Sequence, residues 1–348
     1  MSHNEIRPNY PRNCWYVAAL ADQIADGLHA RRLLGVPVLL YRTADGIPVA
    51  MQDRCAHRAH PLSDGRLDGD LVRCGYHGLA YAPDGCLVDV PSQDSPPRGV
   101  QLRSYPVIEQ DGFIWIWPGE PGAATLRNPP RIPWLGDGAG WTSTHETLRV
   151  EANYLLLHEH YLDLTSVFTL HPEAVPPDID VLPPLDEVEV SERSVTYFRK
   201  TPPSRLAGWE VQITGLPAET RGLRREEGTF VSPALHVQRY VIEPEGARPA
   251  QLLRIQAFTP ESPGVTAVVL QMSRDFAAAD PAVSAFLSEM FHDWALRDAG
   301  TLETVQRCRS EEHRPRRDIN IKADRAALRA RSIVHDMLAE EIRGLVSG

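Results

Sequence analysis

The sequence predicts an α+β fold in which an all-β N-terminal domain is followed by a domain of mixed helices and strands. First, residues up to about 118 contain short apolar runs, such as 36–41 and 112–117, that Gly, Pro and Asp interrupt, a pattern typical of strands joined by turns. Second, helical and strand-like patterns both occur after Trp141. Third, the length of 348 residues fits two domains of about 100–200 residues each.

The expected elements follow in order along the chain. Residues 1–118 form the all-β domain, the Pro- and Gly-rich residues 119–140 are a linker, and 141–348 form the second domain. Within the second domain the patterns predict a helix over about 152–166, a Pro- and Asp-rich loop over 172–186, strands through 187–274, and long helices over 281–310 and 322–345. Loops near a site often carry specificity, which makes 172–186 a candidate for that role.

Charge and cysteine content narrow the class of protein. A formal net charge of −10 argues against nucleic acid and anionic membranes as main partners. No stretch approaches about 18 apolar residues, and the first residues lack the apolar core of a secretion signal. Five cysteines, two of them assigned to a cluster below, fit a reducing cytoplasm better than a disulfide scaffold.

Two mixed cysteine–histidine pairs are the most informative motif. One residue separates Cys55 from His57, two separate Cys74 from His77, and sixteen lie between the pairs. This is the ligand set of a Rieske [2Fe–2S] cluster, in which two thiolates bind one iron and two imidazoles bind the other. Neutral imidazole raises the potential to roughly −150 to +300 mV, against about −400 mV for an all-cysteine plant-type cluster. The motif predicts a one-electron relay of fairly high potential.

A structural zinc site is the alternative for the same four residues. Zinc sites usually pair two cysteines and then two histidines, whereas each pair here supplies one sulfur and one nitrogen. The symmetric split favours two inequivalent irons. Cys14, Cys86 and Cys308 are expected to be small apolar residues rather than ligands.

The residues around the motif resemble the Rieske-type non-haem iron oxygenases, most closely the branch that O-demethylates vanillate and related aromatics. The resemblance rests on segments 13–18, 52–58, 61–65, 74–79, 84–86 and 90–91. It implies a Rieske domain followed by a helix-grip-like α+β catalytic domain with an antiparallel sheet. The resemblance is weak across 174–275, the part that would hold the substrate.

The resemblance also implies a mononuclear iron(II), held by two histidines and a carboxylate with positions open for O2 and substrate. The stretch that matches the family pattern, roughly Asn-x-x-Asp-x-x-His-x4-His, is residues 153–172. In this match Asp163 takes the place of the family's bridging aspartate and His171 that of the second iron histidine. Residues 295–306 resemble the helix with the carboxylate ligand, which implies Asp298.

The chain departs from this pattern at Ser166, which stands where the family has its first iron histidine. Either His160, at a position where the family has an asparagine close to the metal, supplies the missing nitrogen, or iron keeps only His171 and Asp298 with water or Ser166 in a weak site. On one ideal helix His160 and His171 lie about 16 Å apart along the axis, so joint coordination requires a break between them.

The neighbours of His160 bear on this choice. Asp163 lies one helical turn later, where it can accept the other ring N–H of His160. His158 is one position off the proposed face and is expected to be an ordinary polar residue of the helix. The other histidines, among them His145, His236 and His292, are expected to be structural or surface groups.

The resemblance implies partners as well. In the family the bridging aspartate connects two subunits, so His77 of one protomer would meet Asp163 of the next in a homotrimer. The implied reaction is O2-dependent O-demethylation or hydroxylation of a small aromatic substrate. Electrons would come from a separate NAD(P)H-dependent reductase of the flavin and ferredoxin type, because no Gly-x-Gly-x-x-Gly follows a strand here. A catalytically silent electron-transfer or assembly subunit, impaired at Ser166, is the alternative.

Candidate substrate residues interrupt otherwise apolar strands in the weakly matched region. They are Gln238, Arg239, Arg254 and Gln256. A place on the solvent-facing side of each strand is the simpler interpretation of the same residues.

Overall fold

The chain divides into an all-β unit and an α+β unit, which confirms the predicted fold class. The computed structural model describes all residues except 1–9, 133–139, 232, 313–317 and 347–348. Residues Tyr10–Arg131 form the first unit together with Thr259–Ser262. Residues Ile132–Phe258 and those from Pro263 onward form the second.

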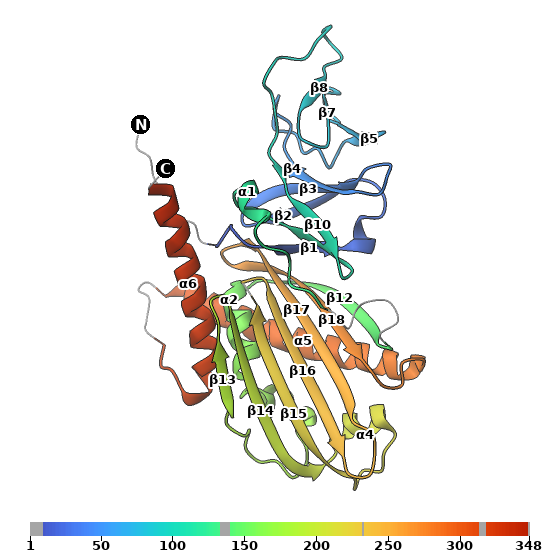
Figure 1. The fold of residues 1–348 in the computed structure, drawn as a ribbon, viewed down its shortest axis with the longest axis vertical. Helices are drawn as coiled ribbons and strands as arrows, with labels where there is room; N and C mark the ends of the chain where they lie inside the picture. Colours follow the sequence, from blue (N-terminus) through green and yellow to red (C-terminus); the bar gives the residue numbers. More distant parts are fainter. Residues whose placement is uncertain (1–9, 133–139, 232, 313–317, 347–348) are drawn as a thin grey trace. The chain divides into compact units, whose positions relative to one another are not determined.

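Three small antiparallel sheets build the first unit (Figure 1). The first contains β1 (Tyr16–Leu20), β11 (Phe113–Ile116) and β10 (Val107–Gln110), and all four residues of its central strand β11 are apolar and buried. The second contains β2 (His29–Leu33), β3 (Val36–Arg42), β4 (Pro48–Gln52) and β9 (Ser104–Tyr105). The third contains β5 (Arg66–Asp68), β6 (Leu71–Arg73), β7 (Ala80–Tyr81) and β8 (Leu87–Asp89). A 3₁₀ turn over Ala21–Ile24 follows β1.

Two loops next to the third sheet approach each other closely. A Cβ atom on Gly75 would lie 2.6 Å from the backbone oxygen of Asp64, which no side chain can do. Glycine is therefore required where the loop after β6 passes the loop before β5.

A seven-stranded antiparallel sheet is the centre of the second unit (Figure 1). Its spatial order is β12-β18-β17-β16-β15-β14-β13. The strands are β12 (Thr142–Val150), β13 (Glu187–Val190), β14 (Ser194–Arg205), β15 (Arg221–Val231), β16 (Leu235–Pro244), β17 (Ala250–Ser262) and β18 (Val265–Arg274). All but β12 lie in the region where the sequence predicts strands.

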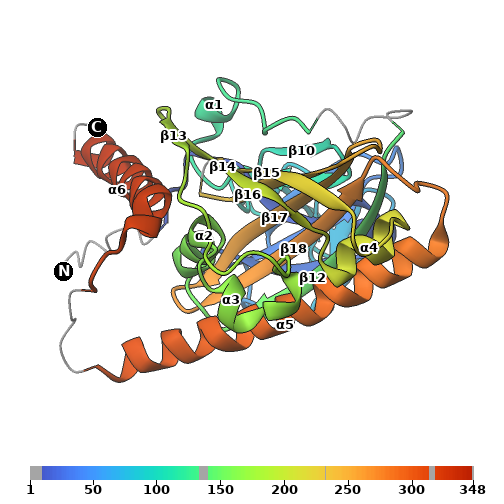
Figure 2. The same ribbon diagram turned by 90° about the horizontal axis from the view of Figure 1, so that it is seen from below.

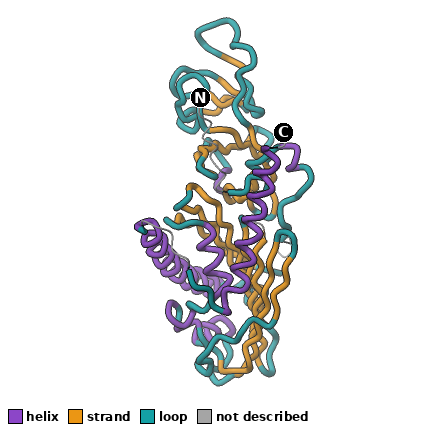
Figure 3. Tube along the Cα trace, turned by 90° about the vertical axis from the view of Figure 1, so that its left-hand side faces the viewer, coloured by secondary structure: helices purple, strands orange, loops and turns teal. Residues whose placement is uncertain are grey.

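The helices of this unit lie on one side of its strands (Figure 3). They are α2 (Tyr154–Asp163), α3 (Val167–Leu170), α4 (Gly208–Thr214), α5 (Pro281–Glu311) and α6 (Arg325–Val346), with 3₁₀ turns over Pro172–Ala174 and Lys322–Asp324. Figure 2 shows α5 running along the unit with α2 and α3 beside it. Apolar residues of α4 and α5 share one core with the sheet, and α6 contacts α2 and β14.

Several helix predictions are confirmed, and others need correction. The two long C-terminal helices begin and end close to the predicted residues. The helix expected over 152–166 is shorter and is followed by a separate turn of helix, α3, while α4 interrupts the region expected to be strands. The expected linker contains the short helix α1 (Pro121–Ala124), and its residues 133–139 lie outside the described residues. None of the helices in the described part of the chain combines the length and apolar character needed to cross a membrane.

Candidate functional site

The loops that carry the two cysteine–histidine pairs have matching backbone hydrogen bonds. In the first loop the amide of Cys55 donates to the carbonyl of His60 at 2.9 Å. In the second loop the amide of Cys74 donates to the carbonyl of Leu79, also at 2.9 Å. Each loop therefore closes five residues after its cysteine and presents its cysteine and histidine in a similar way.

The four side chains of this motif are divided between interior and surface. Cys55 and Cys74 are each 2% exposed within the apolar core of the first unit, whereas His57 and His77 are exposed. The two imidazole centroids lie 4.6 Å apart. The Sγ atom of Cys55 lies 3.2 Å from the hydroxyl oxygen of Tyr81. Two buried thiols and two adjacent exposed imidazoles are the donor set that a Rieske cluster requires.

Burial and backbone amides act in opposite directions on one of these thiols. Burial raises the pKa of Cys74 above its ordinary value, whereas hydrogen bonds from the backbone of Tyr76 and His77 lower it. Amide N–H groups directed at a sulfur also tune the potential of a cluster bound there. The loop thus supplies hydrogen bonds as well as a ligand.

The second candidate centre begins where helix α2 ends. Leu164 adopts a left-handed conformation with φ 59°, and its amide donates to the carbonyl of His160 at 3.3 Å. The chain then turns into α3 and reaches His171 at the C-terminal end of that short helix. This is a break of the kind that joint use of His160 and His171 requires.

Two imidazoles and one carboxylate meet beyond this break. The Nε2 atom of His160 lies 3.0 Å, and that of His171 2.7 Å, from Oδ1 of Asp298. Asp298 comes from α5 and is 4% exposed. Burial raises the pKa of this carboxyl, but the hydrogen bonds with the two histidines outweigh burial and hold the pKa well below its usual range.

The donor chemistry of this cluster fits an iron(II) site. Two imidazole nitrogens and one carboxylate are the ligands of the facial triad of non-haem iron oxygenases. The separations are hydrogen-bond distances, and the described residues contain no three His, Cys, Asp or Glu side chains already spaced as a finished metal site. Ser166 lines the adjacent cavity.

Asp163 and His158 differ from what the sequence predicts. The carboxylate of Asp163 accepts hydrogen bonds from the amide and hydroxyl of Thr165, at 3.2 and 2.9 Å, instead of from His160. His158 is a core residue rather than an ordinary polar one, with Nε2 2.8 Å from the carbonyl of Pro233, and burial lowers its pKa to about 4. The helix turns so that residue 158 faces the sheet, which excludes it from the cluster at Asp298.

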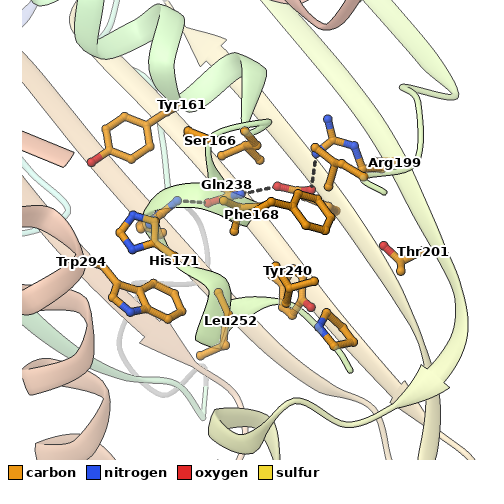
Figure 4. Close-up of a pocket in the computed structure, with 18 of the residues that line it drawn as sticks. Tyr161, Ser166, Phe168, His171, Arg199, Thr201, Gln238, Tyr240, Leu252 and Trp294 are labelled. Carbon is orange, nitrogen blue, oxygen red and sulfur yellow. Dashed lines mark hydrogen bonds and ion pairs between the residues drawn. The ribbon is translucent and has the colours of Figure 1, made fainter. Parts of the chain in front are cut away.

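A cavity of about 160 Å³ lies next to this cluster (Figure 4). The loop expected to carry specificity contributes six apolar residues to its wall: Ala174, Val175, Pro176, Ile179, Leu182 and Pro183. Aromatic residues from the helices and the sheet line it as well: Tyr161, Phe168, Trp209, Tyr240, Phe291 and Trp294. The wall therefore suits a flat apolar molecule.

A row of four polar side chains crosses the sheet side of the cavity, and we call it the polar row. Its members are Arg199, Glu226, Gln238 and Arg254, from the consecutive strands β14 to β17. Arg199 pairs with Glu226 at 3.0 Å, Gln238 donates to Glu226, and Arg254 donates to Gln238, as the dashed lines in Figure 4 trace. Cross-strand pairing places these side chains on one face of the sheet.

A glycine makes room for the polar row. A Cβ atom on Gly228 would lie 2.1 Å from the ring of Tyr197, whose hydroxyl donates to Glu226 at 3.1 Å. Gly228 also lies opposite Gln238 in the sheet register. The missing side chain therefore lets the tyrosine ring approach the row.

The polar row carries one uncompensated positive charge. Arg199 has a carboxylate partner, whereas Arg254 forms no ion pair with any residue that the structure describes. The Nε atoms of both arginines are buried and lack a hydrogen-bond partner in the described part of the chain. A partly buried cation without an ion-pair partner favours a ligand with one negative charge.

The four predicted substrate residues lie in different environments in the structure. Gln238 and Arg254 line the cavity, so the solvent-facing interpretation is wrong for these two. Gln256 is buried but does not line this cavity; it borders a smaller one, and its Oε1 accepts from Nδ1 of His236 at 2.9 Å. Arg239 is exposed and bonds to Gln251 at 3.0 Å, as the solvent-facing interpretation predicts.

Comparison with known proteins finds a family match in each of two parts of the chain. Residues 14–106 match the Rieske [2Fe–2S] domain, and residues 150–340 match the vanillate O-demethylase oxygenase C-terminal domain. The iron–sulfur subunit of the toluene-4-sulfonate monooxygenase system of Comamonas testosteroni is 43% identical over 170 residues, 48% of each chain. The oxygenase component of dicamba O-demethylase of Stenotrophomonas maltophilia is 38% identical over 166 residues, 47% of this chain and 48% of that protein. The chain thus spans about half the length of these curated relatives.

Solved structures resemble the chain over a longer stretch. Dicamba monooxygenase bound to 3,6-dichlorosalicylic acid superposes with a TM-score of 0.87 and 26% identity, covering 96% of this chain and 99% of that one. The same protein with non-haem iron and dicamba gives a TM-score of 0.80 with equal coverage and 26% identity.

Proposed function

Because the chain belongs to the vanillate O-demethylase oxygenase family and carries a Rieske [2Fe–2S] domain, we propose that it is the oxygenase component of a Rieske non-haem iron monooxygenase. In this proposal it uses O2 to O-demethylate or hydroxylate a small aromatic compound. A separate NAD(P)H-dependent reductase supplies the electrons, and a cytoplasmic homotrimer is the working form.

The cofactors of the family are a Rieske [2Fe–2S] cluster and a mononuclear iron, so the zinc alternative is set aside. We assign the cluster to the two cysteine–histidine pairs described above and the mononuclear iron to His160, His171 and Asp298. The iron, when bound, supplies the activation of O2. We assign to Asp163 the transfer of electrons between subunits. It lies between His160 and His171 in the sequence, and its side chain is half-buried.

The cavity indicates the class of substrate. An apolar cavity of about 150 Å³ binds benzene in another protein, so about 160 Å³ suits a single ring. The uncompensated charge of Arg254 would bind one anionic group on that ring, a carboxylate or a sulfonate. Relatives named for toluene-4-sulfonate, dicamba and vanillate agree with this class.

One observation carries the proposal over a catalytically silent subunit. The silent alternative rests on Ser166, but the break after α2 brings His160 to the same carboxylate oxygen as His171. The chain therefore has three donors in place without a histidine at 166.

Metal analysis tests the proposal. Purified protein should contain about three irons per chain, two in the cluster and one mononuclear. The His160→Ala variant should contain about two and produce no formaldehyde from a methoxybenzoate when supplied with a reductase and O2. His335→Ala, a change at an exposed histidine of α6, should retain three. Two irons in the unaltered chain, or unchanged iron and turnover in His160→Ala, would overturn the assignment.

A further inference from the structure

The two oxygens of the Asp298 carboxylate have different partners. Oδ1 faces both His160 and His171, at 3.0 and 2.7 Å. Oδ2 accepts a hydrogen bond from the hydroxyl of Tyr161 at 3.0 Å. We propose that Tyr161 is a positioning residue that fixes this carboxylate so that Oδ1 alone faces the metal site, an inference that rests on the iron site proposed above.

The ring of Tyr161 is held on several sides. It stacks on Phe258 at 5.8 Å and 12°, and on His236 at 6.1 Å and 25°. The guanidinium of Arg254 lies 5.1 Å from its ring centroid. The residue is 6% exposed, so the ring has little room to move. The hydroxyl is thus placed by packing before any ligand binds.

The position of Tyr161 in the chain strengthens this role. It directly follows His160 in α2, whereas Asp298 belongs to α5. The hydrogen bond therefore fixes the carboxylate relative to the helix that carries one of its metal-ligand partners. Groups that hydrogen-bond to a metal ligand commonly hold that ligand in place, and their loss typically lowers metal affinity by about 10–100-fold.

A metal held here would bind this carboxylate through Oδ1 alone. If Oδ2 were free to turn toward the metal, it would occupy a position that O2 or substrate needs. Because Oδ2 already accepts from the Tyr161 hydroxyl, turning it inward would break a buried hydrogen bond. Tyr161 would thus keep a coordination position open.

The Tyr161→Phe variant tests this role because it keeps the ring and removes only the hydroxyl. We expect its affinity for the mononuclear iron, measured by competition with a chelator, to fall about 10–100-fold. The paramagnetic resonance spectrum of the ferrous site with nitric oxide should change its rhombicity, whereas the cluster signal should not change. Tyr154→Phe, in the same helix and buried beside His158, is the matched control and should leave both readouts unaltered.

A second variant separates the effect of the hydrogen bond from any effect of altered packing. Incorporation of 3,5-difluorotyrosine at 161 keeps the ring and makes the hydroxyl a stronger donor, so the nitric oxide spectrum should again differ from that of the unaltered chain while iron is retained. Iron affinity and spectrum that stay unchanged in Tyr161→Phe would overturn the positioning role. Unaltered protein without a third iron would instead overturn the proposed function, so the two failures are distinguishable.

Discussion

Replacing Arg254 with methionine should selectively weaken the use of anionic substrates. Methionine keeps much of the length and apolar surface of arginine but removes the charge, which forms no ion pair with a described carboxylate. The cavity would then lose the group that we expect to meet a substrate carboxylate or sulfonate. A neutral analogue should be affected far less.

The expected magnitude follows from the charge and its burial. Two opposite unit charges about 4 Å apart attract by about 4 kcal/mol at an effective dielectric constant of about 20. Removing one partner of a buried charge pair costs about 2–5 kcal/mol in measured complexes. A loss of about 2–4 kcal/mol corresponds to about 30- to 700-fold in kcat/KM at about 1.4 kcal/mol per factor of ten.

The assay compares kcat/KM for a methoxybenzoate and for its primary amide, with both enzymes loaded with iron and supplied by the same reductase. The ratio of the two values, rather than either alone, reports the charge, because the amide corrects for the lost contact between Arg254 and the ring of Tyr161. Arg239→Met is the matched control, since this arginine lies on the neighbouring strand and is exposed. Equal losses for acid and amide in Arg254→Met would refute the reasoning.

Three further predictions address the iron site and the stability of the catalytic unit. Ser166→His should keep about three irons per chain but lower turnover, because a third imidazole would occupy an open position; a gain in activity would show instead that the natural site is a weakened one. Glu210→Ala leaves Arg224, which is 1% exposed, without its carboxylate partner, so urea unfolding should show a loss of about 3–5 kcal/mol in the free energy of unfolding. The control Glu151→Ala, at an exposed residue, should lose about 0.5 kcal/mol or less. Equal small losses in the two variants would contradict this prediction. Burial lowers the pKa of His236 to about 3 from 6.5, so the folded residue stays neutral while the unfolded one gains a proton. The stability that this residue contributes is complete above about pH 6.5 and should thus fall by about 1.4 kcal/mol per pH unit as the pH drops toward 3. In urea titrations His236→Gln should lower the overall slope by that amount and leave the share of His158, whose pKa burial also lowers, whereas an unchanged slope would contradict the assignment.

The parts of the fold that local patterns determine could be predicted from the sequence. The long helix α5 begins at Pro281 after the cap Asp280, whose side chain accepts from the amide of Ala282 at 2.9 Å, and both residues are visible start signals. Helix α4 could not be predicted in the same way. Its seven residues depend on tertiary contacts, including the buried pair of Glu210 with Arg224.

The candidate site was only partly accessible to sequence reasoning. The Rieske ligands are adjacent in the chain, so their spacing identifies them. The approach of His160 to His171 depends on the left-handed backbone conformation of Leu164. Leucine rarely adopts this conformation, so the sequence does not predict the turn. Strand alternation places Arg199 and Glu226 each on one face of its strand, but only the packed helices show which face is buried.

The turn at Leu164 has a consequence for how such a metal centre can change over evolutionary time. His160 before the turn and His171 after it both reach the carboxylate of Asp298. The two histidines therefore do not have to lie on one continuous helix. A lineage can then give up a histidine after the turn once another is available before it, without rebuilding the scaffold. With His160 as the proposed ligand, position 166 is not needed for the metal, and its small side chain borders the cavity, where it can shape the choice of substrate.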